Sequence, residues 1–115
     1  MDTKNFKMSE FNCSCCGKNN IQQEMLDRLQ ALRDLWGKPM VVTSGYRCVK
    51  RNKAIGGAFK SAHLIGEAVD IKDDGSLYEF CNEEILEKVD LFKEEGTNGW
   101  VHLQTRPASN RVFFR

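Results

Sequence analysis

The 115-residue sequence has few of the features that mark a membrane, nucleic-acid-binding or secreted protein. Nowhere do about 18 apolar residues follow one another, as a membrane-spanning helix requires. The formal net charge is only +1, whereas nucleic-acid-binding domains are strongly basic. The opening residues 1–7 lack the apolar segment of a secretory signal. We therefore expect synthesis in the cytoplasm without a signal peptide, and neither a membrane nor a nucleic acid as partner.

The length and composition are those of one small globular domain. Hydrophobic residues make up 41% of the chain, which is ordinary for a folded domain with its own core. The sequence is too short to supply a second domain of typical size. We expect a single domain over residues 1–115 and a monomer.

Five cysteines, an odd number, argue against a complete disulfide framework. Cys13, Cys15 and Cys16 lie close together, but tetrahedral thiolate sites usually draw on two separated pairs, and Cys48 and Cys81 are isolated. We favour reduced or buried thiols. The alternatives are a disulfide or a cysteine-metal knot that joins the N-terminal segment to Cys48, and catalysis by a cysteine.

Apolar residues with helical spacing begin near Asn20. Asn19 or Asn20 can cap this helix, and Gly37 followed by Pro39 ends it. The apolar stripe is more typical of a core than of a cofactor site, so we assign it no chemistry. Its members are Ile21, Met25, Leu29, Leu32 and Trp36.

The rest of the chain predicts short strands and helices in alternation. We therefore expect an α+β fold, with a mostly antiparallel sheet, helices packed on one face and a metal cleft on the other. Ser76-x-x-Glu79 has the spacing of a capping box. The expected elements are a buried strand at 40–43, a basic helix at 48–55, helical turns from 76 to 89, and a hairpin with strands 90–95 and 99–104. Residues 112–114 either add an edge strand or tuck against the core.

A candidate metal site centres on His63 and Asp70, which are seven positions apart. That separation is too long for one helix face, so a turn carrying His63 followed by a strand carrying Asp70 is expected. Gly66 permits the bend between them. The other histidine, His102, lies in an alternating segment that predicts a strand. Two histidines and an aspartate leave one position of a zinc tetrahedron open, as in catalytic sites, although each residue type also has ordinary hydrogen-bonding roles.

Three blocks of the sequence together resemble the M15 family of zinc peptidases. These blocks are Ser44-Gly45-Tyr46-Arg47, Ser61-x-His63-x-x-Gly66-x-Ala68-x-Asp70 and Trp100-x-His102. They occur in the family's order, and the likeness runs from Phe11 to Arg106. The family includes D-Ala-D-Ala carboxypeptidases and dipeptidases, and L-alanyl-D-glutamate endopeptidases used as phage endolysins.

The resemblance implies a mechanism and a substrate. One Zn²⁺ per chain would be held by His63, Asp70 and His102, and would activate water for hydrolysis. Arg47 would stabilise negative charge on the substrate, while Ser61 and Trp100 would bind it. The implied substrate is a peptidoglycan stem peptide with D-amino acids, cut by a carboxypeptidase or an endolysin-like endopeptidase. The enzyme would reach the cell wall after lysis or on a virion.

The general base departs from the family pattern. Some members have a catalytic acid three residues before the last histidine, where this chain has Gly99. The predicted hairpin offers Glu94 or Glu95 instead, because alternate residues of its first strand share a face with His102. We favour Glu94, with Glu95 as the alternative, and Asp73 or Asp74 after them.

Loss of the acid also supports an alternative function. A chain that keeps the zinc but lacks a base would be a catalytically weak or inactive cell-wall-binding domain, or a structural domain of a phage. The substrate-contacting groups Arg47 and Ser61 favour an enzyme, because a scaffold has no need of them.

Overall fold

The computed structural model describes residues 1–114, and within them five strands form one sheet in the order β1-β2-β4-β3-β5. Neighbouring strands are antiparallel except β3 and β5, which run parallel. The expected α+β fold with a mostly antiparallel sheet is confirmed. The strands are β1 (Val42–Ser44), β2 (Ala68–Lys72), β3 (Phe92–Glu94), β4 (Trp100–Gln104) and β5 (Val112–Phe113).

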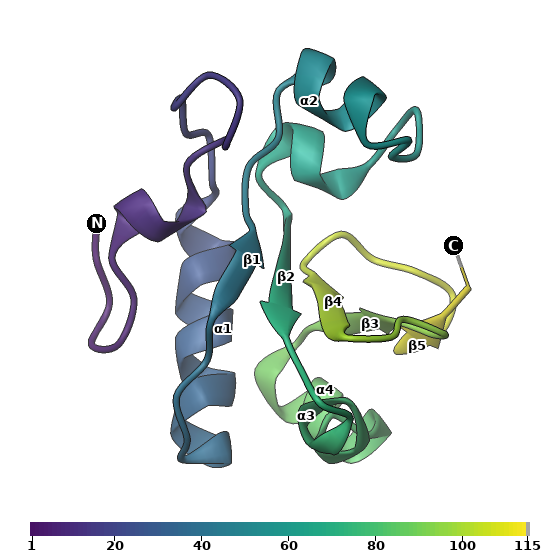
Figure 1. Cartoon of the computed structure of the whole chain (residues 1–115). Helices are drawn as coiled ribbons and strands as arrows, with labels where there is room; N and C mark the ends of the chain where they lie inside the picture. Colours follow the sequence, from purple (N-terminus) through teal and green to yellow (C-terminus); the bar gives the residue numbers. More distant parts are fainter. Residues whose placement is uncertain (115) are drawn as a thin grey trace.

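One face of the sheet packs against helices whose buried side chains complete the hydrophobic core (Figure 1). These helices are α1 (Gln23–Trp36), α3 (Ser76–Phe80) and α4 (Glu83–Val89). The predicted stripe of α1 is buried at Met25, Leu29 and Leu32. Each such side chain contributes roughly 2 kcal/mol by leaving water. Gly37 ends the helix in the left-handed conformation, as the sequence predicts.

Alternation along the two central strands separates the core from the opposite face. On β2, Val69 and Ile71 are buried in the core, whereas Asp70 points to the other face. Asp70 pairs with His102 on β4, directly across the ladder. Two candidate metal ligands therefore lie side by side on the face away from α1.

Three local expectations need correction. The N-cap of α1 is Gln22, and Asn19 instead accepts a hydrogen bond from the Ile21 N–H. The first strand, expected to be buried, is an edge strand, because only β2 pairs with it within residues 1–114; Val41 lies just before it and is 58% exposed. The loop before α3 is held by Asp73, whose carboxylate accepts the N–H groups of Leu77 and Tyr78, so no Ser76–Glu79 capping box is needed.

The N-terminal segment is more ordered than its sequence suggests. Phe6 and Phe11 are buried in the core, and Phe11 ends a 3-10 helix, η1 (Met8–Phe11). The segment then turns back beside the chain that leads from β1 to helix α2 (Val49–Ala54), at the upper end of the molecule in Figure 1. Among the described residues no helix is long and apolar enough to cross a membrane.

Candidate metal centre

His63 is held in place before any ligand binds. It lies in the 3-10 helix η2 (Ala62–Ile65), where the Ser61 hydroxyl oxygen caps the first turn by accepting the His63 N–H. The imidazole is fully buried, and its Nδ1 lies 2.7 Å from the carbonyl oxygen of Gly45. Gly66 follows in the left-handed conformation and bends the chain into β2. The predicted turn and strand are both present.

Asp70 is the point on which the two imidazoles converge. Its Oδ1 lies 3.2 Å from His63 Nε2 and 3.0 Å from His102 Nδ1. The outer nitrogen of His102, Nε2, lies 2.8 Å from the amide oxygen of Gln104. The structure thus brings together the three residues that the sequence singled out, within 4.8 Å of one another at their ligand atoms.

The hydrogen-bond partners of the histidines show that this donor set fits a cation. A carbonyl oxygen can only accept, so the proton of neutral His63 is on Nδ1 and its Nε2 carries a lone pair. The Gln104 amide donates its N–H₂ to the Arg106 carbonyl, so its oxygen accepts from His102 Nε2. Two imidazole lone pairs therefore face a carboxylate. Tetrahedral Zn²⁺ with bonds of about 2.1 Å sets its ligand atoms about 3.4 Å apart, close to the 3.2 and 3.0 Å that separate Asp70 Oδ1 from the two histidine nitrogens.

Electrostatics keep Asp70 ionised. Burial by itself raises the pKa of this carboxyl, but the hydrogen bonds and charge of His102 and His63 outweigh burial and hold the pKa well below its usual range. For His102, burial lowers the pKa, and the hydrogen bond and charge of Asp70 overcome it, so the net shift is upward. Asp70 is thus an anionic ligand at neutral pH, and metal binding there competes with protons for His102.

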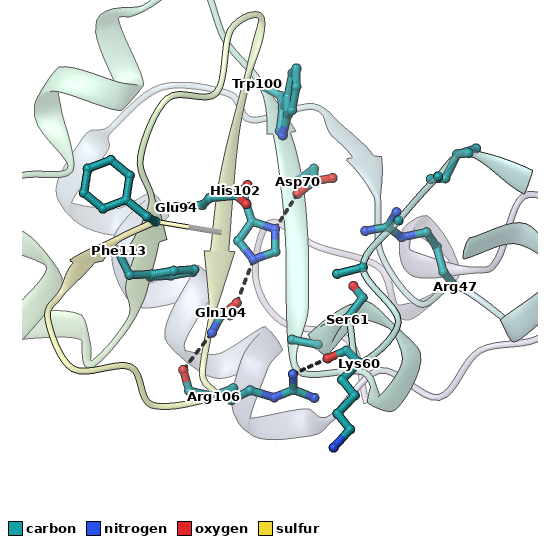
Figure 2. A pocket seen from close by; sticks show the side chains of 16 residues that line it. Arg47, Lys60, Ser61, Asp70, Glu94, Trp100, His102, Gln104, Arg106 and Phe113 are labelled. Atoms are coloured by element: carbon teal, nitrogen blue, oxygen red, sulfur yellow. Dashed lines mark hydrogen bonds and ion pairs between the residues drawn. The ribbon is translucent and has the colours of Figure 1, made fainter. Parts of the chain in front are cut away.

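Asp70 and His102 line a pocket of about 460 Å³ whose walls carry both positively and negatively charged side chains, whereas His63 is fully buried and outside the lining. Figure 2 shows the guanidinium of Arg47 pointing from one wall toward Asp70. Arg47 is fixed by its backbone N–H, which donates to the His63 carbonyl. Gly57 leaves room for it, because a β-carbon there would lie 3.2 Å from Arg47 Nη1 and 2.1 Å from Asn52 Oδ1. Ser61 and Trp100 also line the pocket.

The sheet register places Glu94 and Glu95 differently. Phe92 pairs with Gln104 and Lys93 with Leu103, so the next residue, Glu94, continues toward His102 on the pocket face. Glu94 lines the pocket opposite Arg47, whereas Glu95 is exposed and outside the lining. Asp73 and Asp74 do not reach this pocket; both carboxylates accept hydrogen bonds at the start of α3.

Several pocket residues were not predicted from the sequence. Gln104 lies two residues after His102 on the same strand, so the alternation of side chains along a strand could have placed it on the same face as His102. Phe113 follows a long loop, and only its pairing with Glu94 brings it to the pocket, where its ring lies edge-on to His102. Nothing in the sequence pattern indicates that placement. The other unpredicted lining residues include Lys60, Arg106 and Phe114.

Gln104 is expected to strengthen metal binding without contacting the metal. Removing its amide oxygen in Gln104→Leu takes away the acceptor that fixes the ring of His102. We expect about a 10- to 100-fold loss of affinity for Zn²⁺ at this centre, measured by competition with a chromogenic chelator. Gln104→Glu keeps an acceptor oxygen and should bind at least as tightly as the wild type. Equal affinities of Gln104→Leu and the wild type for Zn²⁺ would show that Gln104 does not strengthen metal binding.

Comparisons with known proteins point to one family. A family model described as Peptidase M15 matches residues 4–104. The zinc D-Ala-D-Ala carboxypeptidase of Streptomyces albus G is 44% identical over 45 residues, which are 38% of this chain. The match spans only 18% of the length of that relative.

Proposed function

The chain belongs to the peptidase M15 family, and we propose that it is a zinc-dependent peptidase that hydrolyses peptidoglycan stem peptides containing D-amino acids. The observation that carries the proposal is the convergence of His63, Asp70 and His102, the last two of which line a pocket. A carboxylate, Glu94, and a guanidinium, Arg47, stand on its walls. Bound Zn²⁺ would supply a Lewis acid that polarises the scissile carbonyl and acidifies water.

The residues of the pocket divide the remaining chemistry between them. Glu94 takes the proton of the attacking water and returns it to the departing amine, as a general base and then a general acid. Arg47 donates hydrogen bonds to the carbonyl oxygen as negative charge develops there. Lys60 and Arg106 add positive charge to the lining, which suits a peptide rich in carboxylate groups. Trp100, 40% exposed at the rim, offers an aromatic surface to the substrate.

Incubation with purified peptidoglycan tests this function. We expect soluble peptides to be released by the zinc-loaded protein, none after treatment with a chelator, and release again when zinc is restored. Mass analysis of the products separates a carboxypeptidase, which frees single D-amino acids, from an endopeptidase, which frees longer fragments. Binding to peptidoglycan without any release would instead favour a cell-wall-binding domain, the alternative that Gly99 supports.

Arg47 is expected to contribute to catalysis rather than to metal binding. Arg47→Ala should keep its zinc and fold but lose activity by about 10²- to 10³-fold, the effect of removing one oxyanion donor. The rates are measured on released peptides, alongside zinc content and circular dichroism. Lys50→Ala is the matched control, because it removes an exposed positive charge from the neighbouring helix α2 outside the pocket lining. Turnover near that of the wild type would reduce Arg47 to a structural residue.

We propose, finally, that the protein acts on the wall from outside the cytoplasm, after cell lysis or as part of a virion. Fractionation of lysing cells and of purified particles with an antibody tests this location. Detection only inside intact cells would contradict it.

A further inference from the structure

Three cysteine sulfurs gather at a second place, away from the pocket. The sulfur atoms of Cys13, Cys16 and Cys48 lie within 4.8 Å of one another. All three thiols are unlinked. Cys81, by contrast, is buried in the core beside the helices, where burial raises the pKa of its thiol to about 12. The three clustered cysteines are therefore separate from the hydrophobic core that encloses Cys81.

Local backbone geometry prepares two of these sulfurs to bind a cation. Cys13 and Cys16 bracket a tight turn in which the Gly17 N–H donates to the Cys13 carbonyl, and Gly17 adopts a left-handed conformation. This turn directs both sulfurs to one side. The Cys13 sulfur also accepts the backbone N–H of Cys48, at 3.4 Å. Sulfur atoms that accept backbone N–H groups are stabilised as thiolates, the form that binds metals.

The third sulfur comes from the start of a helix. Cys48 is the N-cap of α2, and its sulfur accepts the N–H of Arg51 at 3.4 Å. Three thiolates this close repel one another unless a cation lies between them. Soft thiolate ligands favour Zn²⁺, whose tetrahedral bonds of about 2.3 Å place sulfurs about 3.8 Å apart.

We propose that Cys13, Cys16 and Cys48 form a second zinc site, with a structural role and with water as the fourth ligand. The thiol protons pass to solvent as the metal binds, and no oxidant is required. Cys15 lies outside the cluster, so it is not a ligand. This inference does not depend on the proposed peptidase activity.

The location of the cluster indicates what the second zinc would stabilise. Both neighbours of Arg47 are tied to the N-terminal segment: the Tyr46 N–H donates to the Phe11 carbonyl, and the Cys48 N–H to the Cys13 sulfur. Gly45 packs so closely on Phe11 that a β-carbon would lie 2.6 Å from its Cα atom. The zinc would lock these two segments together and thereby hold the loop that presents Arg47 to the pocket.

Metal content and cobalt spectra of the full chain test the second site. Wild-type protein should contain about two zinc ions per chain and Cys48→Ser about one. After exchange to Co²⁺, the wild type should show a near-ultraviolet sulfur-to-cobalt charge-transfer band that Cys48→Ser lacks. A double variant, His63→Ala with His102→Ala, keeps every cysteine and should retain one metal and the full band. It reports on the cysteine site even if Cys48→Ser folds poorly.

Cys81→Ala is the matched control, because it removes a thiol outside the cluster and should leave both the metal count and the band unchanged. Two zinc ions in folded Cys48→Ser, or no charge-transfer band in the double variant, would overturn the proposal. A disulfide among the three cysteines, found by mass analysis of the unreduced alkylated protein, would do the same. A failure of the peptidase activity alone would leave all these readouts intact.

Discussion

Replacing His102 by alanine is expected to remove one zinc ion per chain and to lower peptide hydrolysis by on the order of 10⁴-fold or more. His102 supplies one of the two imidazole lone pairs that face Asp70. Without it, the centre keeps two ligands, too few for the three protein ligands of a catalytic zinc. His63→Ala should give the same result. Elemental analysis measures the metal, and release of peptides from peptidoglycan measures the rate.

The matched control for this prediction lies on the same strand as Asp70. Lys72→Ala removes an exposed side chain two residues from Asp70, opposite Trp100, and outside the pocket lining. It should leave zinc content and activity unchanged. Because His102 is buried, thermal unfolding of each variant separates loss of metal from loss of fold. An unchanged zinc content in both histidine variants would show that these residues are not ligands.

Glu94→Gln is expected to reduce the rate by about 10²- to 10⁴-fold, the usual contribution of general acid-base catalysis. Glutamine keeps the shape and hydrogen-bonding capacity of Glu94 but cannot carry a proton. Zinc content should not change, because Glu94 is outside the group of converging ligands. The rate of peptide release, measured with metal content fixed, reports the loss. A residual rate should remain, since Arg47, together with bound zinc, would still stabilise the transition state.

Glu95→Gln is the internal control for the base. Glu95 has the same chemistry one position later, but it is exposed and does not line the pocket. We expect little effect on rate. A large loss in Glu95→Gln with none in Glu94→Gln would mean that the strand register is shifted by one residue in solution. If neither change slows an active enzyme, the proton acceptor is another residue, and Asp73 and Asp74 are unsuitable because they hold the start of α3.

The absence of an acid at Gly99 has a structural counterpart. Gly99 adopts a positive φ, at 91°, and leads into β4 with open space where a side chain would begin. Glu94 enters the same pocket from the neighbouring strand β3. A carboxylate from a different element can thus occupy the position from which a base acts. The Glu94→Gln experiment therefore tests whether Glu94 replaces the missing acid, as the peptidase requires and the cell-wall-binding domain does not.

The sequence by itself determined the elements whose signals are local. The apolar spacing and terminal glycine of α1 arise from one continuous segment, so periodicity located the helix to within a few residues. The three candidate ligands were identifiable because histidine occurs only twice in the chain, and because the turn at Gly66 and the alternation around Asp70 are also local. The wrong cap for α1 has a local cause too: several adjacent polar residues can accept the same N–H groups, and sequence does not rank them.

Only the tertiary structure decided which distant residues meet. The strand register selects Glu94 over Glu95, because neighbouring residues of a strand point to opposite faces. The pairing of β5 with β3 brings Phe113 to His102 after a loop with no pattern of its own. The cysteines gave an ambiguous signal, since Cys48 and Cys81 are equally isolated in sequence. Packing of Phe11 against Gly45 brings the N-terminal turn to Cys48, while the core encloses Cys81, and those contacts depend on the whole fold.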